Sequence, residues 1–476
     1  MPGNYSELEE KLFSYFREHP NVLGRVVEDY TNKNPAAMEG FIERYLLKKS
    51  LKELMIVANR TAIPFASQVV EELNKIPEVK STGQTISLAN ISINNFPNSE
   101  LNMLSDDSIR HRSVYAIGQW AHDKRPKARS IHDDFAEYNI LLKMLSGIGV
   151  NAVISVLPEL IYDRQDKAEV REPISIKWFF DTLNESGGSN LKRYITVDPH
   201  SKQIQLAAGR PVDIMSSMGL LAGYFARLPD LFGKEIVAVS PDVGGTGRAK
   251  VFARTLGYIL DKEIPLAIID KERKKGGLAK AGDVVGQDRV KGRVAIIVDD
   301  KIDTGGTIDE GAASLLLCGA IPPIYAGAPH CLLSDSPKRN IPTTQFLFER
   351  GIKVVGVGTV YRPDKFVNEA AEWFTELSYA RYIAHAIWVN FTRGSFTNMQ
   401  KRLDDELRTG KVDIKDYVRK STWQPFIRET YCCECGTEIT QTRSVLIEVE
   451  GVRKQAYLLG CPSCKADYVK IGSPDK

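Results

Sequence analysis

The segment whose residues are best suited to binding or catalysis is VAIIVDDKIDTGGTI, at 294–308. Val294–Val298 predicts a buried strand, and Asp299 and Asp300 stand at its carboxyl end. The chain then enters a predicted helix through a tight loop that consists of Asp303, Thr304, Gly305, Gly306 and Thr307. Glycines allow the backbone to approach a phosphate, and a helix start offers unpaired N–H donors.

The two aspartates give this loop a second capability. Their carboxylates suit the hydroxyls of a ribose, or a magnesium ion reached through water. Ligands of open α/β sheets bind outside the carboxyl ends of the strands. The segment therefore predicts a ribose 5-phosphate site. An ordinary strand-to-helix turn is the alternative, and the VDD sequence after a buried strand disfavours it.

Cysteines form the second group of residues that could bind a metal or react. Of seven cysteines, five lie between residues 432 and 464. Two Cys-x-x-Cys pairs flank a hairpin predicted around Gly451 from SVLIEVE and KQAYLLG, and the paired residues are Cys432, Cys435, Cys461 and Cys464. This spacing predicts a closed, structural Zn²⁺ site with tetrahedral geometry. Two reactive redox pairs are the alternative, and Cys433 is an alternative ligand.

The elements that must position these groups alternate regularly from about residue 53 to 395. Short β-branched runs are followed by amphipathic segments, such as 132–146 and 307–318. The runs are 54–58, 113–118, 151–157, 193–198, 235–240, 265–270, 293–300 and 353–360. Several are apolar throughout, as expected of strands covered on both faces. The pattern predicts an α/β fold with mostly parallel sheets.

There are too many predicted strands for one sheet, so we expect two α/β domains in tandem. The expected organisation is a helical extension at 1–52, domains at 53–208 and 209–398, a charged linker at 399–425 and a zinc-ribbon module at 426–476. The segment 378–391 predicts a helix near the end of the α/β core.

Composition limits the partners. The 63 basic and 60 acidic residues leave a net charge of +3, which gives no support for nucleic-acid binding by bulk electrostatics. No run approaches the roughly 18 apolar residues of a membrane helix. The first residues lack an apolar signal-peptide core. We therefore expect a cytoplasmic protein that contacts neither membrane nor nucleic acid.

Six motifs in order resemble those of the ribose-phosphate diphosphokinases, the phosphoribosyl pyrophosphate synthetases. They are NNFPNSE (94–100), YDRQDK (162–167), TVDPHSKQIQ (196–205), VSPDVGGTGRAK (239–250), IIDKERKKGG (268–277) and VDDKIDTGGT (298–307). YDRQDK resembles the family element Ala-Arg-Gln-Asp-Lys. Departures include Pro199 where the family has Leu, LAAGR after Gln205, and HDD at 132–134 for Asn-Asp-Asn. The resemblance implies two tandem phosphoribosyltransferase-type domains.

The resemblance also implies a reaction, the transfer of a diphosphoryl group from ATP to the anomeric hydroxyl of ribose 5-phosphate. Catalysis then needs positioning and charge neutralisation more than a protein nucleophile. Lys271 and Arg273, between a predicted strand and Gly276-Gly277, would neutralise the transition state from a basic flap. His200 and Asp242 would lie near Mg²⁺.

By the same resemblance, Arg164, Gln165 and Asp166 would surround the adenine and phosphates of ATP. Phe96 offers a ring for stacking, and Asn98 and Glu100 offer hydrogen-bond partners. In the family this second group comes from a neighbouring subunit. We therefore expect a homo-oligomer based on dimers, with a hexamer as one option.

Two rival functions stay open at the level of sequence. One is the same transfer to a larger ribose-phosphate such as ADP-ribose, and the terminal extensions are compatible with it. The other is a non-catalytic regulator that binds partners through the zinc ribbon, which the presence of Lys271 and Arg273 disfavours. A plain phosphoribosyltransferase would share VDDKIDTGGT but lack the RQDK, SPDVGG and flap motifs.

Overall fold

A computed structural model describes most of the chain between residues 46 and 419. The described residues are 46–122, 130–168, 170–269, 284–363, 366–367, 370, 372–419 and the backbone of strands within 442–471. The predicted N-terminal extension lies almost entirely outside them. No helix in this described part is long and apolar enough to cross a membrane.

The first α/β half is built on a parallel sheet in the order β1-β4-β5-β6-β7. Its strands are β1 (Leu54–Ala58), β4 (Ser113–Ile117), β5 (Ala152–Leu157), β6 (Leu191–Val197) and β7 (Val212–Met215). The helices that connect them include α4 (Ile63–Lys75), α5 (Pro77–Ser81), α6 (Ile131–Ile148), α7 (Ser175–Gly187) and α8 (Ile204–Ala207). Helix α6 starts at a capping box between Ser130 and Asp133. The runs predicted at 54–58, 113–118, 151–157 and 193–198 are thus confirmed as strands.

The second half has a larger sheet in the order β10-β9-β8-β11-β13-β15-β16, parallel except for the edge strand β10. Its strands are β8 (Ile236–Ser240), β9 (Leu266–Ile269), β10 (Val284–Val285), β11 (Val294–Val298), β13 (Ile321–Ala328), β15 (Lys353–Val357) and β16 (Phe374–Leu377). Short strands β12 (Lys301–Ile302) and β14 (His330–Cys331) pair beside it. The helices include α9 (Met218–Phe225), α10 (Thr246–Leu260), α11 (Gly306–Leu317) and α12 (Thr343–Glu349). The remaining predicted runs are confirmed as strands.

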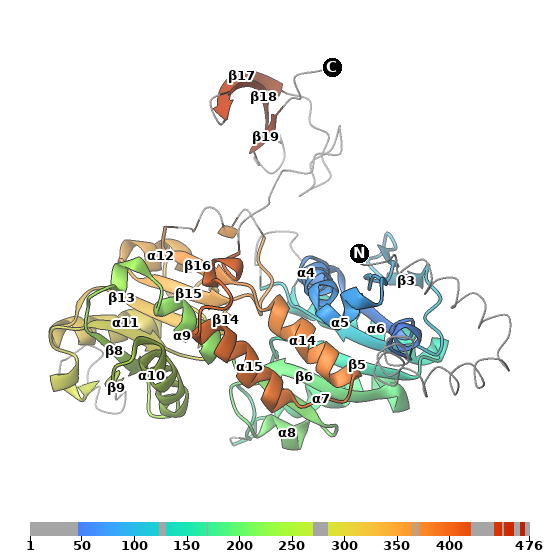
Figure 1. Ribbon diagram of the computed structural model, residues 1–476, viewed down its shortest axis with the longest axis horizontal. Coiled ribbons are helices and arrows are strands. Elements are labelled where there is room, and N and C mark those ends of the chain that lie inside the picture. The colour runs from blue at the N-terminus through green and yellow to red at the C-terminus, as the bar shows by residue number, and fades with distance from the viewer. Residues whose placement is uncertain are drawn as a thin grey trace, which may run out of the picture. The chain divides into compact units, whose positions relative to one another are not determined.

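Helices α14 (Ala380–Phe391) and α15 (Phe396–Arg408) join the two halves. Helix α14 packs on α4 and α15, and α15 packs on α9 (Figure 1). One cluster of buried apolar side chains extends through both halves. The prediction of a helix at 378–391 is confirmed. The charged segment predicted as a linker begins with α15, whose Met399, Leu403 and Leu407 are buried in this core.

Two antiparallel elements form small sheets of their own. The hairpin β2 (Ile91–Asn95) and β3 (Leu101–Ser105) turns through residues 96–100. Near the C-terminus, β17 (Thr442–Val449), β18 (Val452–Gly460) and β19 (Asp467–Ile471) form an antiparallel sheet. Val449 pairs with Val452, which confirms the predicted hairpin around Gly451.

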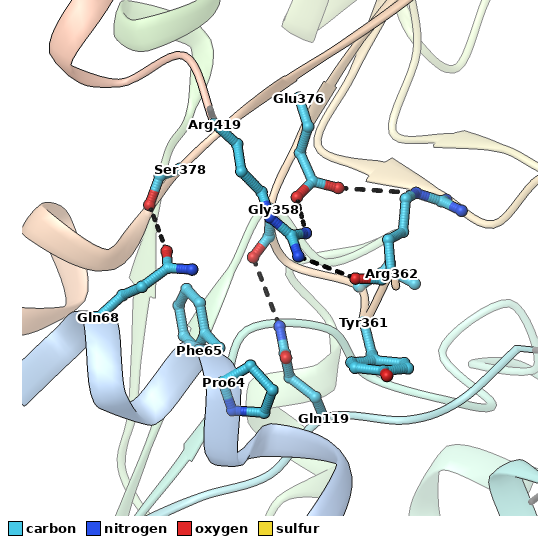
Figure 2. Close-up of a pocket in the computed structure, with 11 residues that line it drawn as sticks. Pro64, Phe65, Gln68, Gln119, Gly358, Tyr361, Arg362, Glu376, Ser378 and Arg419 are labelled. Atoms are coloured by element: carbon cyan, nitrogen blue, oxygen red, sulfur yellow. Dashed lines mark hydrogen bonds and ion pairs between the residues drawn. The ribbon is translucent and has the colours of Figure 1, made fainter. Parts of the chain in front are cut away.

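A small cavity of about 20 Å³ lies at a joint between the halves (Figure 2). The Gln119 side chain, just after β4, donates to the backbone carbonyls of Gly358 and Thr359, just after β15. On the opposite wall, Glu376 lies between the guanidinium groups of Arg362 and Arg419 (Figure 2). A cavity of this size holds a water molecule but no nucleotide, and none of the residues predicted to bind the substrates lines it.

Candidate active site

The DTGGT loop leaves the centre of the second sheet. All residues of β11 are buried, and the loop carries the chain from its carboxyl end into α11. Gly305 adopts a φ of +73°, and a Cβ at this position would meet Leu347 Cδ2 at 2.9 Å. A glycine is therefore required here on two grounds, backbone conformation and space. The result is a compact loop at a helix start, as a phosphate site needs.

The carboxyl groups of Asp299 and Asp300 are neighbours whose pKa values shift in opposite directions. Burial raises the pKa of Asp299 to about 7, and the adjacent Asp300 carboxylate adds to the effect. Burial also opposes ionisation of Asp300, but the hydrogen bond from His200 and the charge of Arg248 outweigh it and hold its pKa low. Asp300 is thus the anionic member of the pair, and Asp299 keeps its proton up to near neutral pH.

His200 bridges the two halves at this point. It follows β6 of the first sheet, and its Nδ1 lies 2.7 Å from Asp300 Oδ2. That hydrogen bond raises the pKa of the imidazole, in spite of partial burial. We predicted from the sequence that His200 and Asp300 belong to one site, and in the structure these two side chains are in contact.

Arg164 brings a second motif to the loop. Its Nη1 lies 2.7 Å from Asp303 Oδ2. Arg164 and Gln165 are exposed and Asp166 is half-buried. The segment expected to contact ATP therefore stands directly against the loop expected to bind the sugar phosphate.

Asp242 lies in the loop between β8 and α10, where its carboxylate accepts a hydrogen bond from the Gly245 N–H at 2.7 Å. Strands β8 and β11 are parallel neighbours, so this loop and the DTGGT loop emerge at the same edge of the sheet. Within the described residues, no cluster of three or more His, Cys, Asp or Glu side chains forms a ready-made metal site.

The hairpin tip carries the remaining predicted ATP contacts. The backbone N–H of Phe96 donates to the carbonyl of Glu100, and the Asn98 side chain accepts from the Glu100 N–H. These bonds shape the turn, and 52% of Phe96 is exposed. The tip thus presents an aromatic ring to its surroundings.

Two arginines in the site were not among the predicted residues. Arg248, in the first turn of α10, lies 3.5 Å from Asp300 Oδ1, and it belongs to the VSPDVGGTGRAK motif. Arg339 donates to the carbonyl of Thr304 and stacks on the ring of Phe346. Arg248 could have been chosen as a basic residue near a loop rich in carboxylates. Nothing in the sequence around Arg339 indicates its contact with the loop.

Several predicted residues lie outside the described part of the chain. They are Lys271 and Arg273 of the basic flap and Cys432, Cys435, Cys461 and Cys464 of the zinc site. Their roles stay predictions.

Comparisons with known proteins identify the chains to which this one is similar. A family model for the N-terminal domain of ribose phosphate pyrophosphokinase matches residues 54–187, and one for the phosphoribosyl transferase domain matches residues 214–320. A ribose-phosphate pyrophosphokinase of Caldanaerobacter subterraneus is 32% identical over 314 residues, 66% of this chain and 87% of that protein. Ribose-phosphate pyrophosphokinase 1 of Lactococcus lactis is 33% identical over 303 residues, 63% of this chain and 85% of that protein.

A solved structure is also similar. The crystal structure of phosphoribosylpyrophosphate synthetase from Mycobacterium smegmatis matches with a TM-score of 0.58 and 30% identity. The match covers 72% of this chain and all of the other.

Proposed function

This chain belongs to the ribose-phosphate pyrophosphokinase family, and we propose from that membership that it transfers the diphosphoryl group of ATP to ribose 5-phosphate. The products are phosphoribosyl pyrophosphate and AMP. The observation that carries this proposal is the Arg164–Asp303 contact of 2.7 Å, because it sets the ATP segment against the sugar-phosphate loop. A direct transfer between two substrates requires such proximity.

The residues divide the work between acceptor and donor. The N–H groups at the start of α11 and the hydroxyls of Thr304 and Thr307 bind the 5-phosphate, while Asp299 and Asp300 orient the ribose. Arg164, Gln165 and Asp166 bind ATP. The anomeric hydroxyl then attacks the β-phosphorus in line, and Lys271 and Arg273 stabilise the charge that develops on the phosphoryl oxygens.

The carboxylate pair also fits a magnesium ion. Two adjacent, largely buried carboxyl groups form an oxygen-rich site. Burial keeps the proton on one of them, and a hydrated divalent cation could bind once that proton is lost. Asp299 and Asp300 would hold it through water, with His200 and Asp242 close by. The bound ion would neutralise charge on the transferred phosphates.

We extend the proposal to assembly and to the C-terminal module. The exposed Phe96 ring and its neighbours Asn98 and Glu100 reach the ATP site of another subunit in a homo-oligomer built from dimers. The four cysteines at positions 432, 435, 461 and 464 hold a structural Zn²⁺. The β17–β18 hairpin supports this, because β18 ends at Gly460, immediately before Cys461. A cytoplasmic location stays a prediction of the sequence.

The test is AMP formation from ATP and Mg²⁺ with ribose 5-phosphate, compared side by side with ADP-ribose. We expect ribose 5-phosphate to be clearly preferred in kcat/KM. A preference for ADP-ribose would replace the acceptor and keep the mechanism. No AMP with either acceptor, from folded protein that binds ATP, would contradict the proposed activity.

A further inference from the structure

Asp163 is a fully buried carboxylate beside the proposed ATP segment. Only 1% of its side chain is exposed. One oxygen lies 2.7 Å from Lys301 Nζ, and the other accepts from the His200 backbone N–H at 3.1 Å. A single side chain thus ties together the three segments that carry Arg164, His200 and Asp300.

Lys301 is the buried counterpart of this carboxylate. Its side chain is 4% exposed, and its ammonium group also donates to the carbonyl of Leu160 at 3.0 Å. Glu159 Oε1 lies 3.4 Å away, and the other Glu159 oxygen contacts His122 Nε2 at 2.9 Å. All three donors of the lysine therefore point to the 159–163 segment of the first half.

These contacts close a ring through the site. Lys301 follows Asp300 in the chain, Asp300 Oδ2 contacts the imidazole of His200, and the His200 N–H returns to Asp163. The family element that YDRQDK resembles has alanine where this chain has Asp163. A buried ion pair contributes little net stability compared with apolar side chains of similar volume. What this pair adds is a fixed geometry between segments.

We propose that Asp163 and Lys301 are a buried positioning pair that sets Arg164, His200 and Asp300 relative to one another for the transfer step. The inference rests on the proposed function. Neither residue contacts a substrate in the proposed reaction. Their contribution is to keep the donor segment and the acceptor carboxylates at the distance that in-line attack requires.

The test compares Asp163→Ala, Lys301→Met and the double variant. Each single change leaves a buried charge without its main partner, so Tm and kcat should both fall. The double variant removes both charges, so its Tm should rise above that of either single variant, while the lost contacts of Lys301 with Glu159 and of Asp163 with the His200 N–H keep it below the wild type. Its kcat should remain at least about tenfold below that of the wild type, because the contacts of Asp163 and Lys301 that fix the three segments are still missing. The KM for each substrate should change less than about threefold.

Recovery of kcat together with Tm in the double variant would show a purely structural pair and overturn the proposal. The matched control is Arg381→Met with Glu406→Ala, which removes a pair of the same 2.7 Å length between α14 and α15. It should leave kcat unchanged.

Hydrogen exchange separates this inference from the proposed function, because it needs no turnover. In the double variant, peptides that cover His200 and residues 299–307 should exchange faster than in the wild type, and a peptide from α14 should not. Unchanged exchange at His200 would refute the positioning pair. Faster exchange with an inactive wild type would instead refute the proposed function and leave the pair standing.

Discussion

Asp299 and Asp300 follow one another in the chain, yet their neighbours give them different charges. Only Asp300 receives the His200 hydrogen bond, and Arg248 is closer to it, at 3.5 Å against 3.9 Å for Asp299. Burial meanwhile raises the pKa of Asp299 to about 7. With Asp299 protonated, the two carboxyl groups lie side by side without repulsion between two negative charges. The pair can then bind a cation when Asp299 loses its proton.

The basic flap gives the sharpest prediction for one residue. Lys271→Ala should lower kcat at least about 100-fold with little change in Tm, because it removes a charge that stabilises the phosphoryl transition state. Steady-state kinetics and thermal unfolding measure the two quantities. Lys275→Ala, at a position we expect to be solvated, is the matched control. Near-normal turnover of the Lys271 variant would remove the role assigned to the flap.

The phosphate loop predicts a selective effect on one substrate. Asp303→Ala and Thr307→Ala should each raise KM for ribose 5-phosphate at least about tenfold, and KM for ATP far less, because both residues belong to the acceptor loop. Initial rates with each substrate varied in turn provide the measurement. An equal rise in both constants for Asp303→Ala would show that its contact with Arg164 serves ATP instead.

At the scale of elements, the alternation of apolar runs predicted the strands of both sheets well. Runs such as 294–298 are buried on both faces, so their composition alone marks them. The segment from residue 399 is predicted as a charged, helical linker, and α15 confirms the helix, but the charges hide the burial of Met399, Leu403 and Leu407 in the core. Each of these residues is four positions from the next, which places them on one face of a helix.

The site was predictable only where motifs are contiguous. The DTGGT loop and its aspartates lie within one segment, so local rules identified them. The contact of Arg339 with Thr304, and that of Lys301 with Asp163, join segments that are far apart in the chain. The first contact lies within the second half and the second joins the two halves, so both depend on tertiary packing, which residue spacing does not encode.

The junction of α15 with α9 and α14 predicts a pH-dependent stability. Burial raises the pKa of Asp404 to about 6, although the hydroxyl of Tyr382 donates to it. The folded protein therefore favours the protonated form, and ionisation above pH 4 costs stability until about pH 6, beyond which the cost is complete.

Asp404→Asn removes that cost. It should raise the free energy of unfolding by roughly 1–3 kcal/mol at pH 8 and by much less at pH 4.5. Urea unfolding at the two pH values gives the comparison. Asp405→Asn, on the same helix but paired with Arg408, should show no gain that grows with pH. A gain of equal size at both pH values would argue against titration of Asp404.

At the scale of the whole molecule, the two halves share one core and one site. The joint at Gln119, helices α14 and α15, and the contacts of His200 and Arg164 all cross between the halves. In the proposed reaction the first half supplies the ATP segment and the second half supplies the acceptor loop, so neither half should catalyse the transfer alone.

We expect the C-terminal module to bind a zinc ion that takes no part in the reaction. Protein purified without chelator should contain about one zinc per chain, and activity should still require added Mg²⁺, because a Cys₄ site is closed to substrates. Elemental analysis provides the count. Replacing Cys432 and Cys461 by serine should abolish the zinc, whereas Cys433→Ser should not. Absence of zinc from the unaltered protein would contradict the ribbon.

The last prediction concerns assembly through the β2–β3 hairpin. If Phe96 and Glu100 complete the ATP site of a neighbour, a chain with both changed to alanine and a chain with Lys271→Ala should each be nearly inactive alone. In a mixed dimer, the intact Lys271 of the first chain meets the intact tip of the second, so one of the two sites is whole. Random pairing makes half of the dimers mixed, so co-expression should restore about a quarter of wild-type activity. If the tip instead serves its own chain, every site carries one defect, and co-expression should restore nothing. The comparison needs only the two variants, their co-expressed mixture and an assay of AMP release.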